Sequence, residues 1–335
     1  MKPPDFWQSG RGTLLPHLLS PLSSVVASVT ARRVAKPGWR APVPVICVGN
    51  VTVGGAGKTT VALDLGRRLR EKRVRLHFLT RGYGGSVKGV RCVQPGDPPT
   101  LVGDEALLLA ELAPTWVAAD RAASARAAVA AGAQLLVMED GLQNPTLAKD
   151  LSLLVVDGPT GFGNGFVLPA GPLREPLKTA ASRCQAAVII GPDQAGVAAA
   201  LPPGLPIIRA GLAPAAEIAD LRGRRVLAAT GIARPEKFFH MLEEHGVSVA
   251  VRAAFPDHHQ FTTHELDGLR NQATREDLIL VITPKDAARL NPQDRKDFRV
   301  IGVSLLWQDA AAIDRLLSPS ALKMRSADRS PTSQR

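Results

Sequence analysis

The sequence predicts an α/β fold in which a mainly parallel sheet is flanked by helices and accompanied by a second, smaller α/β domain. Three observations support this fold class. A short apolar run, 43–48, leads into a glycine-rich turn and then into a helical pattern at 59–69. Further apolar runs alternate with helical patterns, as parallel strands and their connecting helices do. A chain of 335 residues, of which 45% are hydrophobic, is long and apolar enough for two domains.

Composition narrows the classes of partner and the cell compartment. The net charge of +11 favours an anionic partner such as nucleic acid, an acidic lipid surface or a phosphorylated substrate. Aromatic residues, at 4%, are too few to stack on bases, so we expect no nucleic-acid partner. Three widely spaced cysteines are typical of a reducing cytoplasm. The chain shows no signal-peptide pattern and no apolar run of the roughly 18 residues that a bilayer requires.

The first 40 residues predict an amphipathic helix. It runs from Thr13, a good N-cap, to about Ala35, and its leucines and valines fall on one face. Four basic residues lie near its end, namely Arg32, Arg33, Lys36 and Arg40. An apolar face beside a basic cluster is typical of a helix that lies on an anionic membrane surface. The alternative is a helix that packs on the domain behind it, and these residues favour neither.

The stretch 48–60 predicts a site for the phosphates of a nucleotide. A strand that enters a glycine loop followed by Lys-Thr and a helix presents backbone N–H groups and the positive end of the helix dipole to an anion. We expect Lys58 to reach the terminal phosphates of the nucleotide and the Thr59 hydroxyl to bind Mg²⁺. The other nucleotide-binding positions are Thr52, Val53, Gly54, Gly55, Ala56 and Gly57. Thr52 stands where the usual P-loop pattern has its first glycine, so this loop is a variant.

Arg81 and Asp104 are the next candidates, and each has a purely structural alternative. A predicted strand at 74–79 ends in a glycine turn that contains Arg81, which can form two hydrogen bonds to a phosphate or simply face solvent. Asp104 opens a predicted helix at 104–112. A carboxylate there is either the N-cap of that helix or a general base beside the phosphate site.

A pair of carboxylates, Glu139 and Asp140, follows the apolar run 135–138. Open α/β sheets bind ligands at the carboxyl ends of their strands. Acidic residues in that position hold Mg²⁺ directly or through water. Asp157 ends a similar run but is a single carboxylate, so the pair is the better metal candidate.

Two loops hold further candidates. The Gly/Pro-rich loop 158–176 places Arg174 next to Glu175, which serve phosphate and metal or form an exposed ion pair of little consequence. His258 and His259 are adjacent in a loop at a predicted strand end. Because neighbouring side chains point apart, His258 can relay or orient a proton for a carboxylate across a domain cleft. The alternative is a solvated pair, and the lack of a third nearby ligand argues against zinc.

Pattern and composition divide the chain into five parts. The first 40 residues form the helical segment, and the P-loop core takes 41–205. A hairpin-like linker takes 206–224, and strand–helix alternation resumes at 225–318 in the smaller α/β domain. The polar tail, 319–335, is expected to be disordered.

Together these motifs resemble those of one family, the tetraacyldisaccharide 4′-kinases (LpxK) of lipid A biosynthesis. The resemblance extends from Trp7 to Asp286. Its motifs are Val48-Gly-Asn-Val-Thr-Val-Gly-Gly-x-Gly-Lys-Thr59, Arg81-Gly-Tyr-Gly84, Gly103-Asp-Glu105, Asp140-Gly-Leu-Gln143, Gly163-Asn-Gly165, Leu168-Pro-Ala-Gly-Pro-Leu-Arg-Glu175, Asp257-His-His-x-Phe261 and Lys285-Asp286.

The resemblance implies ATP-dependent phosphorylation of the 4′-hydroxyl of an acylated glucosamine disaccharide 1-phosphate, which yields lipid IVA. It also implies a peripheral protein on the cytoplasmic face of the bacterial inner membrane, with its N-terminal helix on the anionic lipid surface. We expect a monomer. Asp104 would be the base and His258 its partner. The implied Mg²⁺ ligands are Thr59, Glu139, Asp140 and Glu175, and the implied substrate or phosphate residues are Asn50, Arg81, Gln143 and Arg174.

One departure from the family pattern bears on the metal. Glu139 stands where the family has the first of two aspartates. Its longer side chain leaves open whether Glu139 or Asp140 contacts the ion.

The alternative from another class is a membrane-associated P-loop NTPase switch of the partitioning or metallochaperone type, which shares the Gly-Gly-x-Gly-Lys-Thr-Thr run. Partitioning ATPases carry a second lysine just before the paired glycines, where this chain has Val53. Metallochaperones usually have clusters of cysteine and histidine, which this sequence lacks.

Overall fold

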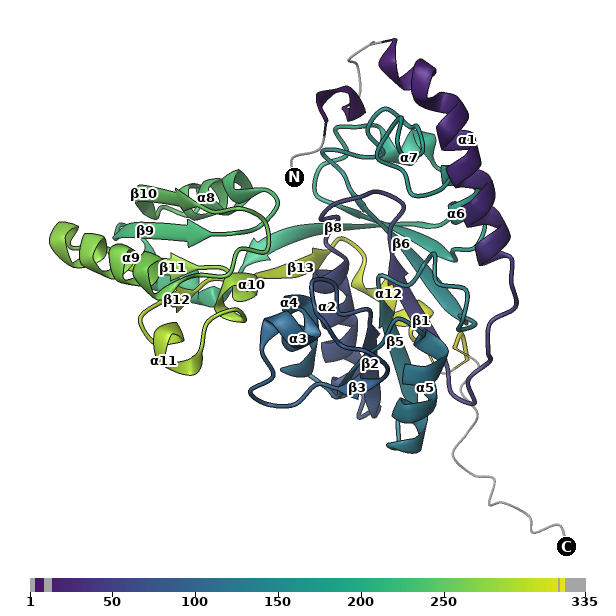
Figure 1. Ribbon diagram of the computed structural model, residues 1–335, viewed down its shortest axis with the longest axis horizontal. Helices are drawn as coiled ribbons and strands as arrows, with labels where there is room; N and C mark the ends of the chain where they lie inside the picture. The colour runs from purple at the N-terminus through teal and green to yellow at the C-terminus, as the bar shows by residue number, and fades with distance from the viewer. Residues whose placement is uncertain (1–3, 9–13, 319, 323–335) are drawn as a thin grey trace, which may run out of the picture.

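The computed structural model describes residues 4–8, 14–318 and 320–322, which form two sheets with helices around them (Figure 1). The strands of the larger sheet are β1 (Val45–Gly49), β2 (Leu76–Thr80), β3 (Arg91–Cys92), β4 (Thr115–Val117), β5 (Leu135–Glu139), β6 (Leu151–Asp157), β7 (Ala186–Ile190), β8 (Ile207–Pro214) and β13 (Val303–Trp307). The strands of the smaller sheet are β9 (Arg225–Thr230), β10 (Ser248–Ala254), β11 (Ile279–Ile282) and β12 (Arg299–Val300).

Helices precede, connect or follow these strands. Those in the part of the chain that forms the larger sheet are α1 (Leu15–Val34), α2 (Lys58–Glu71), α3 (Pro99–Val102), α4 (Asp104–Ala110), α5 (Arg121–Ala130), α6 (Leu177–Ala181), α7 (Val197–Ala200) and α12 (Ala310–Leu316), with a short 3-10 turn η1 (Asp5–Trp7). Those that accompany the smaller sheet are η2 (Ala216–Leu221), α8 (Pro235–Glu244), α9 (Thr263–Glu276), α10 (Pro284–Ala287) and α11 (Pro292–Arg295).

The larger sheet has the strand order β13-β8-β7-β6-β1-β5-β2-β4-β3, and the smaller has the order β10-β9-β11-β12. Among the described strands, only the pairs at the two ends of the larger sheet, β13 with β8 and β3 with β4, are antiparallel. All the other neighbours are parallel. This topology confirms the predicted fold class.

The central strands are buried on both faces, and for this reason their sequences are continuous apolar runs. In β1, Ile46 and Val48 join the core beneath α2, whereas Cys47 joins the core on the opposite face. Because β1, β5 and β6 are parallel, their carboxyl ends meet at one edge of the sheet. Glu139, the phosphate loop and Asp157 therefore follow one another in this order along the same edge.

An antiparallel pair of strands links the two parts of the molecule (Figure 1). The chain leaves the larger sheet along β8 and returns along β13. The helix α12 then packs through Ile313 against the core of the larger sheet. The predicted linker at 206–224 thus contains strand β8 of the larger sheet and the short helix η2, and residues 303–316 accompany the larger sheet although the sequence predicts one small domain over 225–318. An apolar run indicates a buried strand but does not specify which sheet the strand joins.

The helix α1 lies along the outside of the larger part (Figure 1). A serine lies on its face toward the protein, and an apolar stripe lies on its exposed face. The face toward the protein carries Ser23, whose hydroxyl donates to the Val167 carbonyl at 2.6 Å and accepts from the Ala170 amide at 3.2 Å. The other face carries an apolar stripe, which consists of Leu14, Leu15, Leu18, Leu22, Val25 and Val29. Leu18 in this stripe is 74% exposed. The predicted cap Thr13 lies outside the described residues, as does most of the tail predicted to be disordered.

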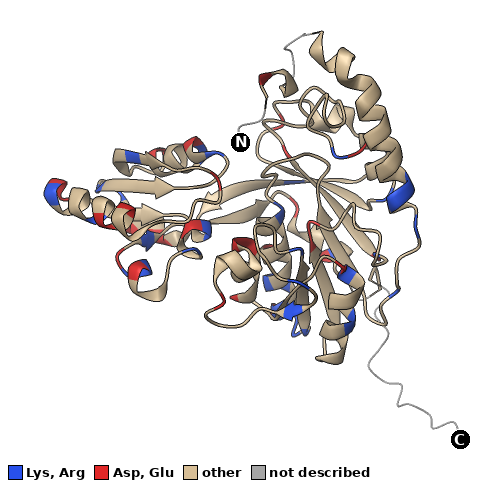
Figure 2. Ribbon diagram, viewed as in Figure 1, with Lys and Arg blue, Asp and Glu red and all other residues tan. Residues whose placement is uncertain are grey.

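Basic residues gather at the carboxyl end of α1, where Figure 2 shows the helix turning blue after an uncharged length. Arg32, Arg33, Lys36 and Arg40 are all exposed. Of the helices that the structure describes, none combines the length and the apolar character needed to cross a membrane.

Candidate active site

The phosphate loop connects β1 to α2 and leaves its backbone accessible. Gly54 and Gly57 have φ angles of 112° and 87°, in the left-handed region that favours glycine. A Cβ atom at Gly54 or Gly55 would meet no other atom within 4 Å, so open space lies in front of this backbone. Gly57 caps α2, whose first residue is Lys58. The loop therefore presents N–H groups at the positive end of a helix, as an anion site requires.

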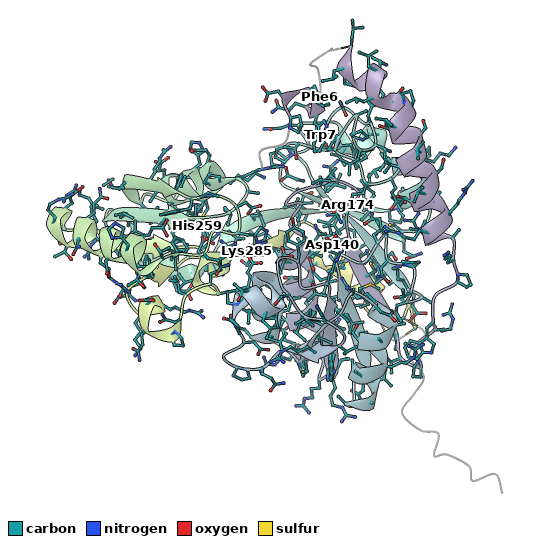
Figure 3. All side chains as sticks on the ribbon, viewed as in Figure 1. Phe6, Trp7, Asp140, Arg174, His259 and Lys285 are labelled. Atoms are coloured by element: carbon teal, nitrogen blue, oxygen red, sulfur yellow. The ribbon has the colours of Figure 1, made fainter. Side chains whose placement is uncertain are left out.

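Lys58, Asp140 and Arg174 form the first charged group beside this loop. The Nζ atom of Lys58 lies 3.6 Å from Oδ1 of Asp140. Nη1 of Arg174 donates to both carboxylate oxygens of Asp140, at 2.9 and 3.1 Å, and Figure 3 shows the two side chains next to each other. Burial would raise the pKa of Asp140, but the nearby cations outweigh it and hold this pKa below its usual range. Asp140 is therefore a carboxylate between two cations that could also hold phosphate.

Thr59 and Glu139 form a second group, with Glu105 as a partner that the sequence reasoning did not single out. Oγ1 of Thr59 lies 3.2 Å from Oε1 of Glu105 and 3.5 Å from Oε1 of Glu139. Thr80 donates to the other oxygen of Glu139 at 3.1 Å. Burial raises the pKa of Glu139, and the negative charges of Glu105 and Asp140 raise it further. Oxygen atoms crowded in this way suit a hard cation such as Mg²⁺.

This oxygen cluster alone does not complete a metal site. Within the described parts of the chain, no three His, Cys, Asp or Glu side chains are grouped so that they could hold an ion by themselves. Mg²⁺ usually keeps several waters and binds through one or two carboxylates together with substrate phosphates. The donor set at Thr59 and Glu139 fits an ion that arrives with a nucleotide.

Asn50, Gln143 and Glu175 form a third group. Nε2 of Gln143 donates to the Asn50 carbonyl and to Oε1 of Glu175, both at 2.9 Å. Arg183 donates to the same Glu175 oxygen at 2.8 Å. Oε2 of Glu175 and Oδ1 of Asn50 are buried without a hydrogen-bond partner, which is costly unless a ligand or water supplies one. None of the hydrogen bonds of Glu175 in the described structure reaches Thr59 or Glu139.

Asp104 and His258 meet across the boundary between the two parts of the molecule. Asp104 is the first residue of α4, and Nδ1 of His258, in the loop after β10, lies 3.1 Å from its Oδ2. The Glu105 amide donates to Oδ1 at 3.0 Å, so the carboxylate also serves the helix start. Arg289, which follows α10, donates to Oδ2 from Nη2 at 2.6 Å and from Nε at 3.2 Å.

These contacts set the protonation of both groups. Burial would raise the pKa of the Asp104 carboxyl, but hydrogen bonds from His258 and Arg289 outweigh it and hold this pKa well below its usual range. The hydrogen bond to Asp104 raises the pKa of His258. The neighbouring His259 points elsewhere, because its Nε2 contacts the carboxylate of Glu265 at 3.0 Å.

Further ion pairs cross the same boundary. Nζ of Lys285 lies 2.6 Å from Oε1 of Glu105, and Figure 3 places Lys285 where the two parts meet. Asp157, at the end of β6, pairs with Arg234 at 2.7 Å and with Lys237 at 2.6 Å. The carboxyl edge of the larger sheet is thus held by basic residues of the smaller part.

The structure brings most, but not all, of the predicted residues into these groups. Arg81 is exposed in the turn after β2, and it forms no hydrogen bond or ion pair with another described residue. Among the residues at the site to which the sequence reasoning gave no role, Glu105, Lys285 and Arg289 lie around Thr59 and Asp104. The Gly-Asp-Glu and Lys-Asp motifs mark two of them, whereas nothing local marks Arg289.

Comparisons with known proteins cover nearly the whole chain. The family model described as Tetraacyldisaccharide-1-P 4′-kinase matches residues 15–320. The tetraacyldisaccharide 4′-kinase of Gluconacetobacter diazotrophicus is 51% identical over 318 residues, which is 95% of this chain and 97% of the relative. That of Rhodospirillum centenum is 51% identical over 326 residues, or 95% and 96% of the two chains. A crystal structure of LpxK from Aquifex aeolicus in complex with ATP is similar, with a TM-score of 0.72 and 25% identity over 90% of this chain and 98% of that one.

Proposed function

The chain belongs to the tetraacyldisaccharide 4′-kinase family of lipid A biosynthesis, and we propose that it transfers the γ-phosphoryl group of ATP to the 4′-hydroxyl of a tetraacylated glucosamine disaccharide 1-phosphate. One observation carries the proposal. Thr59, Glu139 and Glu105 form a cluster of oxygen atoms between two functional groups. On one side lies the phosphate loop, whose Lys58 directly precedes Thr59. On the other side lies the Asp104–His258 pair, whose Asp104 directly precedes Glu105. Such a site has one side for the donor and one for the acceptor.

On the donor side, we propose that the loop from Thr52 to Gly57 and the Lys58 ammonium hold the phosphates of ATP. Asn50 and Arg174 lie beside this loop, since Nδ2 of Asn50 donates to the Thr52 carbonyl at 2.8 Å and the Arg174 amide donates to the Val51 carbonyl at 2.7 Å. Thr59 and Glu139, with Asp140 and Glu175, would hold Mg²⁺, which neutralises charge on the transferring phosphates. The contacts of Thr59 favour Glu139 as the direct ligand, since Asp140 is already paired with Lys58 and Arg174.

On the acceptor side, Asp104 takes the proton of the attacking hydroxyl. The 4′-oxygen forms a bond to the γ-phosphorus, the bond from that phosphorus to the β–γ bridging oxygen breaks, and ADP leaves with the electron pair. The depressed pKa keeps Asp104 ionised and ready to accept a proton, with His258 donating to its other oxygen. A weak base suffices, because phosphoryl transfer depends mainly on position and electrostatic stabilisation.

The raised pKa of Glu139 predicts that Mg²⁺ binding depends on pH. Without the ion, Glu139 holds its proton above the ordinary carboxyl range, so Mg²⁺ must displace that proton. We expect the Mg²⁺ concentration that gives half-maximal rate, at fixed excess ATP, to fall as pH rises through this raised pKa. The Glu139→Gln variant has no proton to lose there, so its pH dependence is the matched control. Equal pH slopes for the two proteins would contradict direct ligation by Glu139.

We further propose that α1 binds the anionic surface of the membrane on its cytoplasmic side. The face with Ser23 hydrogen-bonds to the protein, so the apolar stripe is directed outward. The exposed basic cluster from Arg32 to Arg40 suits acidic headgroups at the end of that stripe. A substrate with four acyl chains would be met at this surface, and its sugar would reach the site from there. We propose a monomer, since one chain supplies every group named above.

The stripe gives a prediction for lipid binding. Replacing both Leu18 and Leu22 by Glu should lower partition onto vesicles that contain acidic lipid by at least about tenfold, because each buried leucine contributes on the order of 2 kcal/mol. Co-sedimentation measures this partition. Ser24→Glu is the matched control, since Ser24 is exposed on the same helix but outside the stripe. Undiminished binding of the double variant would contradict a membrane role for this face.

Label transfer tests the proposed reaction itself. Purified protein is incubated with γ-labelled ATP, Mg²⁺ and the tetraacylated disaccharide 1-phosphate, and the lipid is separated by chromatography. Label in the lipid is the expected result. Hydrolysis of ATP without transfer would contradict the proposal and favour the NTPase switch.

A further inference from the structure

We propose that Arg289 is a positioning residue for phosphoryl transfer, which fixes the orientation of the Asp104 carboxylate from across the domain boundary. The side chain of Arg289 is 0% exposed and that of Asp104 is 3% exposed. A guanidinium removed from water in this way must be fully engaged, since an unpaired buried charge is strongly unfavourable. The inference rests on the proposed role of Asp104 as the base.

Arg289 is itself fixed by hydrogen bonds within the smaller part. Its Nη1 donates to Oδ1 of Asp286 at 3.0 Å and to the Gly231 carbonyl at 2.8 Å. Asp286 is fully buried and accepts from the hydroxyls of Thr230 at 2.7 Å and Thr283 at 2.6 Å. The planar guanidinium transmits this fixed orientation to Asp104, because its N–H groups point in set directions.

The hydrogen bonds of Arg289 determine which carboxylate oxygen of Asp104 remains free to accept the substrate proton. Both of its bonds to Asp104 and the contact from His258 go to Oδ2. Oδ1 receives only the amide of the adjacent Glu105 among these groups, so it keeps lone pairs for an incoming hydroxyl. Without Arg289 the carboxylate would lose its tightest partner and could turn about its side-chain bonds. The substrate proton would then meet its acceptor in the wrong orientation.

Steady-state kinetics of Arg289→Gln and Arg289→Lys test this inference. We expect Arg289→Gln to lower kcat by about 10- to 100-fold with the KM for ATP within about twofold of wild type, as for other residues that orient a reacting group. Arg289→Lys keeps the positive charge but lacks the planar, forked set of N–H donors. We therefore expect its kcat to lie between that of Arg289→Gln and that of wild type. It also serves if Arg289→Gln does not fold. Wild-type kcat in Arg289→Lys would overturn the inference.

Two further proteins separate positioning from a general effect on domain packing. Arg295→Gln removes an exposed ion pair with Glu111 across the same boundary and should keep wild-type kcat. If Arg289 acts through Asp104, then Arg289→Gln should cause no further loss of kcat in an Asp104→Asn background. Losses that multiply in the double variant, or an equal loss in Arg295→Gln, would overturn the inference. An Asp104→Asn protein with wild-type kcat would instead remove the base on which the inference rests.

Discussion

Asp104→Asn should lower kcat by about 10²- to 10⁴-fold and leave the KM for ATP within about twofold, which is the range expected when a general base is removed. The asparagine has the same shape but cannot accept the proton of the 4′-hydroxyl. The side chains that contact the Asp104 carboxylate, His258 and Arg289, belong to the smaller domain, and Lys58 is not among them. Transfer of label to the lipid at saturating ATP measures kcat directly.

The matched control is Glu111→Gln, which removes an exposed carboxylate from the end of the same helix. This variant should keep wild-type kcat and KM. An unimpaired kcat in Asp104→Asn would exclude Asp104 as the base and leave His258 as the next candidate for that role.

The pH dependence of folding stability gives an independent check on the geometry around Asp104. Because the pKa of Asp104 is depressed in the folded protein, its charge stabilises the fold at neutral pH, and this contribution is lost as pH falls through the folded pKa.

The donor half of the site could be predicted because its parts are local. The phosphate loop is one continuous segment between β1 and α2, and Lys58 follows its last glycine. Glu139 ends β5 and Asp140 directly follows it, and parallel pairing puts that strand end next to the loop, with Val48 opposite Glu139. A motif and the topology of a parallel sheet are together enough to bring these groups to one edge.

The residues that complete the acceptor half could not be predicted in the same way. Lys285 and Arg289 lie four residues apart and resemble the solvated face of a short helix, where most charged residues belong. They meet Glu105 and Asp104 only because the smaller part packs against α4 of the larger one, across 180 and 185 residues of sequence. Burial of Arg289 is a consequence of that packing and has no signature in its neighbours.

The N-terminal helix illustrates a third case. Its sequence periodicity identifies an apolar face but does not say whether that face is turned inward or outward. The structure turns Ser23 inward, where backbone groups of Val167 and Ala170 satisfy its hydroxyl. A serine that bonds to a loop about 144 residues away cannot be distinguished in the sequence from one that faces solvent. The direction of the stripe therefore depends on a tertiary contact.

Lys58→Met should raise the KM for ATP by at least about tenfold and lower kcat by about 10²- to 10³-fold, as expected when a group that stabilises transferring charge is lost. Methionine keeps the apolar stem and removes only the ammonium. Lys58 is buried at the first turn of α2, and its Nζ lies 3.6 Å from Oδ1 of Asp140. Arg174 remains on Asp140 through two hydrogen bonds, so the turn that carries the acidic pair should persist.

Lys72→Met is the matched control, because Lys72 lies at the other end of α2 and pairs with Asp314 on the surface. Its kinetics should equal those of wild type, and an unchanged KM in Lys58→Met would contradict phosphate binding by this lysine. Lys58→Met and Asp104→Asn together also distinguish a lipid kinase from an NTPase switch. Whichever of the two the protein is, Lys58→Met should abolish most turnover of ATP. A switch that only hydrolyses ATP has no acceptor hydroxyl for Asp104 to deprotonate, so its turnover would survive Asp104→Asn, whereas lipid phosphorylation would not.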